Sequence, residues 1–297
     1  MNIISKIKNR YYNRFKTKDF QSLKKMNQPN LEFIKNTDSS DLTLSNLEEI
    51  TFDLVNDDIK EIISCFNKNG IVVLPNFLSK ELISKIRSSI QPLLDSSSKK
   101  SYSYTNNEKD FRKFRKSSPD DLLINERDNK DAGMLDIYNV NKVFNDEIME
   151  ELNMLLKGDK IKKLLKSKEN NSDFNLTLNA YYNKSVQSTR GFHVDAFYPV
   201  IKGMIYLSDV NELESGAYCY VKKSHKPNSL TEINKKISRL YVGEITETPF
   251  VEVNELTPVL GKAGTLIFSD QAGAHRGLPQ SSDKDRTMLV SKFIAKK

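Results

Sequence analysis

The spacing of the hydrophobic residues changes from a helical period to an alternating one near Asp173, and this change constrains the fold more than any other feature. Before Asp173, apolar residues recur three and four positions apart, whereas afterwards they alternate with polar residues, as in strands with one buried face. Helices followed by seven or eight short strands predict an antiparallel sandwich or barrel with the helices packed outside it. The sequence contains neither an internal repeat nor a glycine-rich phosphate loop.

Two helices around a short strand are predicted in the helical half. The first begins at residues 57–58, two aspartates, and ends at residues 69–70, Asn-Gly. The strand is the apolar run 71–74, and Ser79 caps the second helix. These elements supply apolar faces that can cover one side of a sheet.

A polar and charged stretch, residues 96–131, follows these helices and is interpreted as a loop. Within it the run 111–116, Phe-Arg-Lys-Phe-Arg-Lys, either faces solvent or steers an anionic substrate. Further helices are predicted at 141–156 and 159–168. Strands are then predicted near 174–182, 191–195, 200–207, 216–221, 249–253, 264–268 and 286–294, with turns at Ser215-Gly216 and Ala263-Gly264.

The net charge of +7 belongs entirely to residues 1–26, which hold eight basic residues and one acid. The rest of the chain is neutral, which argues against nucleic acid as a partner. Apolar residues recur in this basic arm at helical spacing, so it forms a helix that packs on the body, a surface that touches anionic lipid or another partner, or an organelle transit segment. Residues 27–46 resemble a linker, and we predict an appendage at 1–50 and one domain at 51–297.

No apolar run is long enough to cross a membrane, and the first residues lack the hydrophobic region of a signal peptide. Two cysteines, Cys65 and Cys219, are too few for a disulfide framework. A cytoplasmic protein with two free thiols is therefore expected. The oligomeric state is left open.

Three histidines occur in the chain, and two of them have the context of a metal site. His193 and Asp195 lie two apart in a predicted strand, where alternate side chains point to one face. His275 follows another predicted strand, between small residues that allow close approach to a bound centre. Two imidazoles and one carboxylate form the facial triad of non-heme Fe(II) oxygenases.

Arg286 makes this interpretation more specific, since the separate elements are common by chance. Ten residues separate it from His275, and it opens an apolar strand. A dicarboxylate co-substrate that chelates iron through its 2-oxo-acid end needs a cation for its far carboxylate, and arginine provides a bidentate fork. We therefore expect Fe(II), 2-oxoglutarate and O₂ as cofactor and co-substrates.

The chain resembles the phytanoyl-CoA dioxygenase family of Fe(II)- and 2-oxoglutarate-dependent oxygenases over most of residues 57–296. The resemblance is carried by residues 69–79, by the His193/Asp195 pair, by residues 214–217 and 221–226, and by residues 264–268 with His275 and Arg286. It implies a double-stranded β-helix (jelly-roll) core braced by N-terminal helices. It also implies His193, Asp195 and His275 as iron ligands, and Arg286 as the clamp on 2-oxoglutarate.

One departure from this family lies near His225. Members often have Pro-Gly before the Ser-His-Lys segment, where this chain has Lys222-Lys223, so the turn is expected to differ. His225 itself is interpreted as structural. Neighbouring families fit less well, because nucleic-acid demethylases place two arginines further from the second histidine and prolyl hydroxylases usually use lysine. Halogenases replace the carboxylate ligand, whereas Asp195 is present.

Further candidate residues surround the iron site. Alternation along 174–182 places Thr177, Asn179 and Tyr181 on one face. If that face lines the barrel, Asn179 can bond to 2-oxoglutarate and Tyr181 can wall the pocket; otherwise both pack or face solvent.

Thr189 and Arg190 precede the metal pair on a predicted mouth loop, where Arg190 would hold a substrate carboxylate or phosphate. Tyr206 either belongs to the core or lines the cavity. The leading hypothesis is hydroxylation of a C–H bond in a small biosynthetic molecule. Desaturation or oxidative cyclisation is an alternative with the same cofactors, and a non-catalytic binding module held by the basic arm is an alternative of another class.

Overall fold

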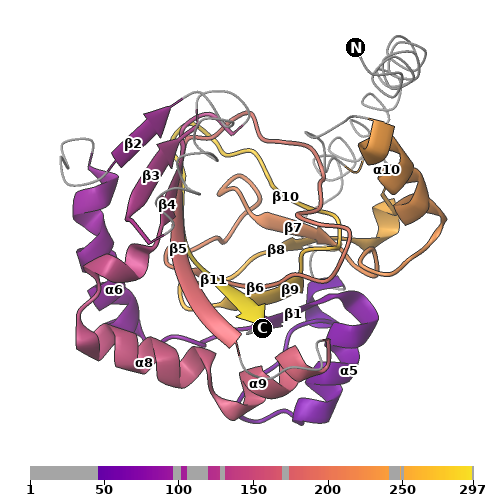
Figure 1. Cartoon of the computed structure of the whole chain (residues 1–297), viewed down its shortest axis with the longest axis horizontal. Coiled ribbons are helices and arrows are strands. Elements are labelled where there is room, and N and C mark those ends of the chain that lie inside the picture. The colour runs from indigo at the N-terminus through magenta and orange to yellow at the C-terminus, as the bar shows by residue number, and fades with distance from the viewer. Residues whose placement is uncertain are drawn as a thin grey trace, which may run out of the picture.

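A computed structural model describes residues 46–95, 102–105, 120–127, 131–168, 174–240, 248 and 251–295. A large sheet and a small sheet face each other, and helices lie along the outer side of the large sheet (Figure 1). The basic arm, most of the predicted linker and the run 111–116 lie outside the described residues.

The first two helices and the strand between them follow the sequence prediction. Helix α5 (Ile59–Asn69) begins where the Asp58 side chain accepts a hydrogen bond from the Lys60 backbone N–H, and it ends at Gly70 with a left-handed φ of 79°. All four residues of β1 (Ile71–Leu74) are buried. Helix α6 (Lys80–Leu94) begins at Ser79, whose hydroxyl accepts from the Leu82 N–H at 3.1 Å.

The two later helices were also predicted, and they complete the outer layer. A short 3₁₀ helix, η1 (Val140–Val143), precedes α8 (Asp146–Leu156) and α9 (Asp159–Lys166). Apolar side chains from the helices and from one face of the large sheet form one buried cluster, which includes Phe66, Ile86, Leu152, Phe268 and Leu289. This cluster fixes the large sheet from behind and leaves its other face for the site.

The large sheet has the strand order β1-β9-β6-β11-β5-β4-β3-β2, antiparallel except for the parallel pair β2–β3. In that order, the strands are Ile71–Leu74, Leu266–Asp270, Ile201–Tyr206, Asp285–Ala295, Phe174–Lys184, Met134–Tyr138, Leu123–Glu126 and Tyr102–Thr105. Strand β11 pairs with β5 over its whole length, so the register of these two strands is strongly fixed.

The small sheet has the order β10-β7-β8, with β10 at His275–Gly277, β7 at Tyr218–Val221 and β8 at Leu256–Val259. Met204, Tyr206 and Val290 from the large sheet pack with Tyr220 and Val259 from the small one. This second core shows that the two sheets face each other. The prediction of a mainly antiparallel β-fold with helices outside is confirmed.

Two of the strand predictions are wrong for the residues that the structure describes. Residues 191–195 form an irregular segment in which His193 makes only an isolated bridge to His275. In the predicted run 249–253, Val251 and Glu252 lie in no strand, and Val253 begins the 3₁₀ helix η2 (Val253–Glu255). His193 and Asp195 do bond through the backbone to residues 275 and 271, but these few bonds do not continue into a regular ladder.

The loop predicted at 96–131 was wrong in part. It contains β2 and β3, and β3 buries Leu123 and Ile124 although most of the stretch is polar. Strands β4, β8 and β10 and helix α10 (Ser229–Leu240) were not predicted. Strand β10 has only three residues, too few for a periodic signal.

Both cysteines are free thiols: Cys219 is buried and Cys65 is half-buried. Among the described residues, no helix is both long and apolar enough to span a membrane. At the start of the described chain, Ile50 is buried and the Asn46 side chain donates to the Leu256 carbonyl at 3.0 Å. Residues 46–50 are thereby tied to the small sheet.

Candidate metal centre

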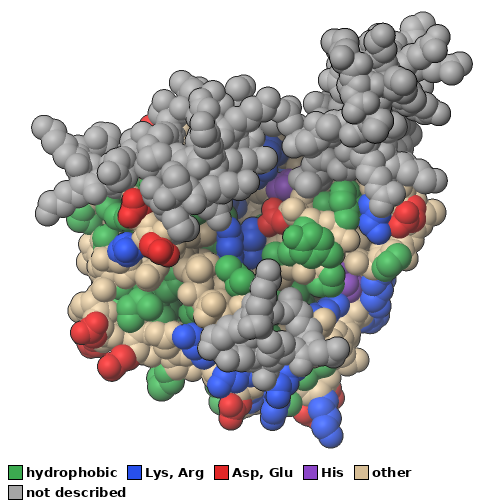
Figure 2. All heavy atoms as spheres, viewed as in Figure 1, with side chains coloured by type: hydrophobic (Ala, Val, Ile, Leu, Met, Phe, Trp, Pro, Cys, Tyr) green, Lys and Arg blue, Asp and Glu red, His purple; other side chains and the backbone are tan. Residues whose placement is uncertain are grey.

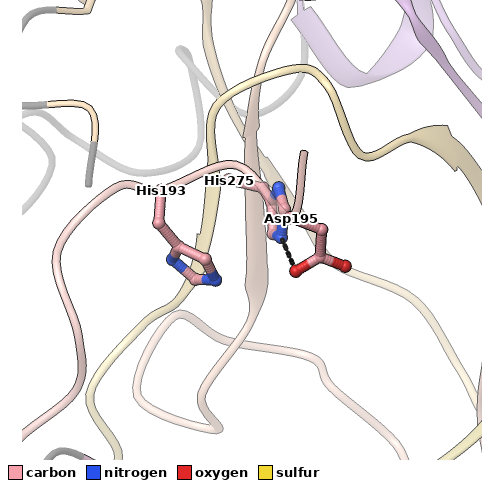
Figure 3. Close-up of side chains that lie close together, drawn as sticks. All are labelled: His193, Asp195 and His275. Carbon is pink, nitrogen blue, oxygen red and sulfur yellow. Dashed lines mark ion pairs between the residues drawn. The ribbon is translucent and has the colours of Figure 1, made fainter. Parts of the chain in front are cut away.

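His193, Asp195 and His275 lie together, with one potential ligand atom from each within 4.8 Å of the others (Figure 3). The His275 Nε2 atom is 3.9 Å from Asp195 Oδ1, and the two imidazole centroids are 4.6 Å apart. The backbones of His193 and His275 exchange two hydrogen bonds, of 3.0 and 2.9 Å. Backbone pairing between a loop and β10 therefore brings the three side chains together.

Each imidazole is oriented by a hydrogen bond to a backbone carbonyl. Nδ1 of His193 lies 3.0 Å from the Gly191 oxygen, and Nδ1 of His275 lies 2.9 Å from the Gly273 oxygen. Because a carbonyl only accepts, each Nδ1 carries the proton and each Nε2 keeps its lone pair for a metal. Two such nitrogens and a carboxylate suit a divalent transition metal with open positions.

The protonation states also suit a metal. Burial lowers the pKa of His275 to about 4 and, together with Arg190 and His275, lowers the pKa of His193 well below its usual value. Burial alone would raise the pKa of Asp195, but Lys202 and the two histidines hold it well below the usual range. Neutral imidazoles beside an ionised carboxylate are the forms that bind metal.

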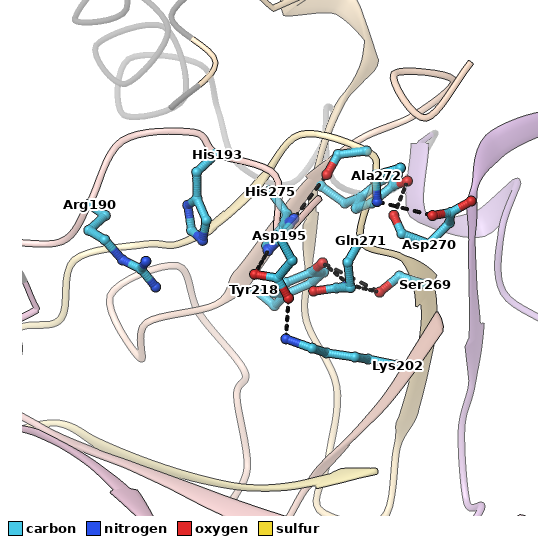
Figure 4. A network of polar contacts seen from close by, with 12 residues as sticks. Arg190, His193, Asp195, Lys202, Tyr218, Ser269, Asp270, Gln271, Ala272 and His275 are labelled. Atoms are coloured by element: carbon cyan, nitrogen blue, oxygen red, sulfur yellow. Dashed lines mark hydrogen bonds and ion pairs between the residues drawn. The ribbon is translucent and has the colours of Figure 1, made fainter. Parts of the chain in front are cut away.

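Lys202 is a part of the site that the sequence reasoning missed. Its ammonium contacts Asp195 Oδ2, whereas Oδ1 of the same carboxylate faces His275 (Figure 4). Lys202 is 8% exposed and lies on β6. The signal was available, since residues 201–206 are otherwise uncharged and a lysine in a fully buried strand needs a partner.

Arg286 is the second residue of β11, and its guanidinium is buried. Its Nη2 donates to Asn183 Oδ1 at 3.0 Å, and its Nη1 donates to the Gly216 carbonyl. Nη2 also lies 3.6 Å from where a Cβ would stand at Gly277, two residues beyond His275. The buried Nε has no hydrogen-bond partner among the described residues, so the guanidinium keeps a donor for a ligand.

The predicted residues on β5 point between the sheets. Tyr181 packs with the core shared by both sheets, and Asn183, which shares its face, contacts Arg286. Asn179 is buried, and its Oδ1 accepts from the Asn139 backbone N–H at 3.2 Å. Asn183 was not singled out, although it continues the same alternation two residues further along.

Thr189, Arg190 and Tyr206 have different surroundings. Arg190 donates from Nε to Asp131 Oδ2 and from its backbone to Oδ1 of the same carboxylate, both at 2.8 Å. The Thr189 hydroxyl accepts from Arg276 at 2.6 Å. Tyr206 is fully buried, and its hydroxyl donates to the Val259 carbonyl, which fits the core alternative.

Histidine, acidic and basic side chains are visible on the face seen in Figure 2. The arginine and aspartate side chains near His193 form a network of ion pairs. Asp131 also pairs with Arg127, and Arg127 forms a bidentate ion pair with Asp136 at 2.8 and 3.2 Å. The charge of Arg190 is thus held in a network of two arginines and two aspartates. This network fixes the direction of Arg190 beside His193 (Figure 4).

His225 is not part of the triad. It lies in a turn, half-buried, with Nε2 donating to the Asn67 carbonyl at 3.3 Å and Nδ1 buried without a hydrogen-bond partner among the described residues. Lys223, the second residue of the Lys222-Lys223 pair, takes a left-handed φ of 66°. This backbone conformation favours glycine, although a lysine adopts it here.

We expect His225 to make the fold sensitive to acid. Burial lowers its pKa from 6.5 to about 4, so the folded protein binds fewer protons than the unfolded chain. Its contribution to stability is complete above pH 6.5 and is lost as the pH falls towards 4. When the pH is lowered from 7.5 to 5, the free energy of unfolding of the wild type should fall by about 1 to 2 kcal/mol more than that of His225→Asn. Urea unfolding at both pH values measures this difference, and equal losses would contradict the burial of a neutral imidazole.

The sequence profile of the phytanoyl-CoA dioxygenase (PhyH) family matches residues 66–288, which include the triad and Arg286. The chain belongs to this family. Its members are non-heme iron enzymes that depend on 2-oxoglutarate, so the predictions of an oxygenase and of its cofactors are confirmed, and the non-catalytic alternative is excluded. No curated protein sequence matches the chain.

Several solved structures share the fold of this chain. The non-heme alpha-ketoglutarate-dependent carbocyclase SnoK from nogalamycin biosynthesis is 15% identical with a TM-score of 0.55, covering 82% of this chain and 87% of that one. The epimerase SnoN from the same pathway is 14% identical with a TM-score of 0.52, covering 80% and 82%. HygX from Streptomyces hygroscopicus with iron bound is 16% identical with a TM-score of 0.50, covering 78% and 85%. At these identities the likeness shows the fold alone, and it confirms the predicted double-stranded β-helix.

Proposed function

We propose that this PhyH-family protein hydroxylates an unactivated C–H bond of a small biosynthetic molecule, with iron bound by His193, Asp195 and His275. The observation that carries the proposal is the triad itself: two imidazoles present Nε2 atoms beside one ionised carboxylate. When bound, iron and 2-oxoglutarate would let O₂ oxidise the substrate: one oxygen atom enters the product as a hydroxyl group, the other enters succinate, and the lost carboxylate leaves as CO₂. The protein's part is to orient these groups and the substrate.

Backbone carbonyls and a lysine side chain around the triad hold its geometry. The Gly191 and Gly273 carbonyls fix the ring directions of His193 and His275. Lys202 holds one oxygen of Asp195 and leaves the other facing His275. Such outer contacts matter because a C–H bond misplaced by about 1 Å can cost on the order of a hundredfold in rate.

Arg286 is proposed to bind the far carboxylate of 2-oxoglutarate. Its buried Nε needs an acceptor, and Asn183 and Gly216 already fix its other two nitrogens. A buried guanidinium whose Nε–H has no partner, and whose two terminal nitrogens each carry a second N–H, suits a carboxylate. Asn179 lies on the same face of β5 as Asn183 and is proposed to line the co-substrate side of the cavity.

On the substrate side, we propose Tyr181 as a wall of the pocket and Arg190 and Thr189 at its mouth. Asp131 fixes Arg190 through Nε and leaves its two terminal nitrogens without a partner among the described residues. A polar group of the substrate can bond there. Tyr206 is proposed to act as core support, because its hydroxyl already bonds to Val259 and accepts from the Tyr218 N–H.

Succinate formation tests the proposed activity. Wild-type protein loaded with Fe(II) under nitrogen and then exposed to O₂ should convert 2-oxoglutarate to succinate, and a true substrate should accelerate this conversion. Mass spectrometry of the product separates the outcomes: hydroxylation adds one oxygen atom, whereas desaturation or ring closure removes two hydrogen atoms. A product without an added oxygen atom would contradict hydroxylation. The reaction would then be one of the other types, such as those named for the carbocyclase and the epimerase that share this fold.

A further inference from the structure

A buried polar cluster outside the triad connects two of the proposed metal ligands. Gln271 directly follows β9 and is 1% exposed. Its side-chain Nε2 donates to Ser269 Oγ at 2.7 Å and to the Tyr218 hydroxyl at 3.3 Å. The Tyr218 and Ser269 oxygens lie 3.4 Å apart, so the three side chains contact one another pairwise. Figure 4 shows this arrangement, and we call the three residues the Gln271 cluster.

The backbone of Gln271 holds the first of these ligands. The Asp195 N–H donates to the Gln271 carbonyl at 3.0 Å, and the Gln271 N–H donates to the Val200 carbonyl at 2.8 Å. Asp195 lies in an irregular segment, so a single backbone bond of this kind matters more there than inside a regular strand. The position of Gln271 therefore bears directly on where the Asp195 side chain starts.

The Tyr218 ring packs against the second ligand. Its centroid is 5.7 Å from that of the His275 imidazole, and the two ring planes are 33° apart. Strand pairing places His275 opposite Tyr220, two residues beyond Tyr218 on β7, so all three side chains share one face of the small sheet. The Gly273 carbonyl fixes the imidazole at Nδ1 only, and a ring held at one atom can still tilt. The Tyr218 ring restricts this tilt.

The direction of the Tyr218 ring depends in turn on Gln271. Burial raises the pKa of the Tyr218 phenol, so the hydroxyl stays neutral, and a buried hydroxyl needs a hydrogen-bond partner. Among the described residues, its partners are the two other members of the Gln271 cluster. Removal of the Gln271 amide would leave the phenol with one contact of 3.4 Å, to Ser269. The ring would then be held less firmly beside His275.

We propose that Gln271 is a positioning residue of the metal centre. Its backbone places Asp195, and its side chain, acting through Tyr218, sets the plane of His275. One residue thereby fixes two ligands that come from different segments of the chain. This inference rests on the proposed function, because it assigns the iron to the same triad. Mutation of residues that only support metal ligands typically costs about 10 to 100-fold in metal affinity or activity.

Anaerobic calorimetric titration with Fe(II) tests this role in full-length variants. Gln271→Leu removes the amide but keeps the backbone bond to Asp195, and Tyr218→Phe removes the hydroxyl but keeps the ring. Each should weaken Fe(II) binding about tenfold. Because both changes break the same contact, the double variant should bind within about twofold of the weaker single variant. Tyr182→Phe, which removes a hydroxyl 3.4 Å from Asp285, is the matched control and should bind as the wild type does.

Three results would overturn the inference. In the first, either single variant, folded by near-ultraviolet circular dichroism, binds Fe(II) as tightly as the wild type. In the second, the two losses multiply in the double variant, which shows that the side chains act separately. In the third, Tyr182→Phe loses as much affinity as Tyr218→Phe. If Gln271→Leu does not fold, Tyr218→Phe alone decides by the same criterion. A wild type that binds no Fe(II) would instead refute the proposed function, and the inference would fall with it.

Discussion

Replacing His275 with alanine should weaken binding of a divalent metal by more than a hundredfold and abolish succinate formation. Mutation of a residue that merely supports a ligand typically costs 10 to 100-fold in metal affinity, so removal of a ligand costs more. The fold should survive, because His275 pairs with His193 through two backbone hydrogen bonds that alanine retains. Anaerobic Fe(II) titration by calorimetry measures the loss.

The matched control for this variant is His225→Asn, which removes the histidine outside the triad. It should bind one Fe(II) per chain with the affinity of the wild type at pH 7.5, where the wild-type imidazole is neutral. If His275→Ala kept stoichiometric binding of the metal, His275 would not be a ligand. If His225→Asn lost it as well, the effect would be one of folding.

Replacing Arg286 with leucine should raise the Kd for 2-oxoglutarate by about 30-fold or more while leaving Fe(II) binding intact. Truncating one partner of a buried, hydrogen-bonded charge pair costs about 2 to 5 kcal/mol, which corresponds to that loss of affinity. The metal should still bind because the three ligands lie on other segments. Titration of the iron-loaded protein with 2-oxoglutarate, followed by its visible band, gives the Kd.

Arg87→Leu controls for the loss of a positive charge, since Arg87 is exposed on α6. It should leave the Kd unchanged. Arg286→Lys should fall between wild type and Arg286→Leu, because lysine keeps the charge but not the fork. An Arg286→Leu protein that bound 2-oxoglutarate normally would show that the far carboxylate lies elsewhere.

The triad could be predicted from the sequence, but the reason given for its geometry was only partly right. His193 and Asp195 were expected to share one face of a strand, whereas they lie in an irregular segment. Backbone pairing of His193 with His275 provides the alignment instead. The identity and the spacing of the ligands can be read from the sequence. The contact between residues 82 positions apart in the chain depends on the tertiary structure.

Lys202 and Asn183 were missed for different reasons. Lys202 lies in a strand read as apolar, and its role depends on Asp195, which reaches it only in the folded chain. Asn183 continues the alternation of Asn179 and Tyr181, so the prediction stopped one step too early along β5. A rule that every buried charge needs a partner would have singled out Lys202.

The edge of the large sheet was the least predictable part of the fold. Strands β2 and β3 lie in a polar region of the sequence, where the hydrophobic alternation that predicts a strand is weak. Strand β3 pairs with β4, and Arg127, just after β3, forms an ion pair with Asp136 of β4. This ion pair, and not a hydrophobic pattern, distinguishes the pairing. The periodicity of hydrophobic residues along the sequence does not reveal such ion pairs.

The most direct test of the account is the visible spectrum of the anaerobic wild-type protein with Fe(II) and 2-oxoglutarate. The account predicts a charge-transfer band that saturates at one Fe(II) and one 2-oxoglutarate per chain and is absent from His275→Ala. A folded wild-type protein that gives no band, or a band that His275→Ala retains in full, would contradict the assignment of iron to His193, Asp195 and His275.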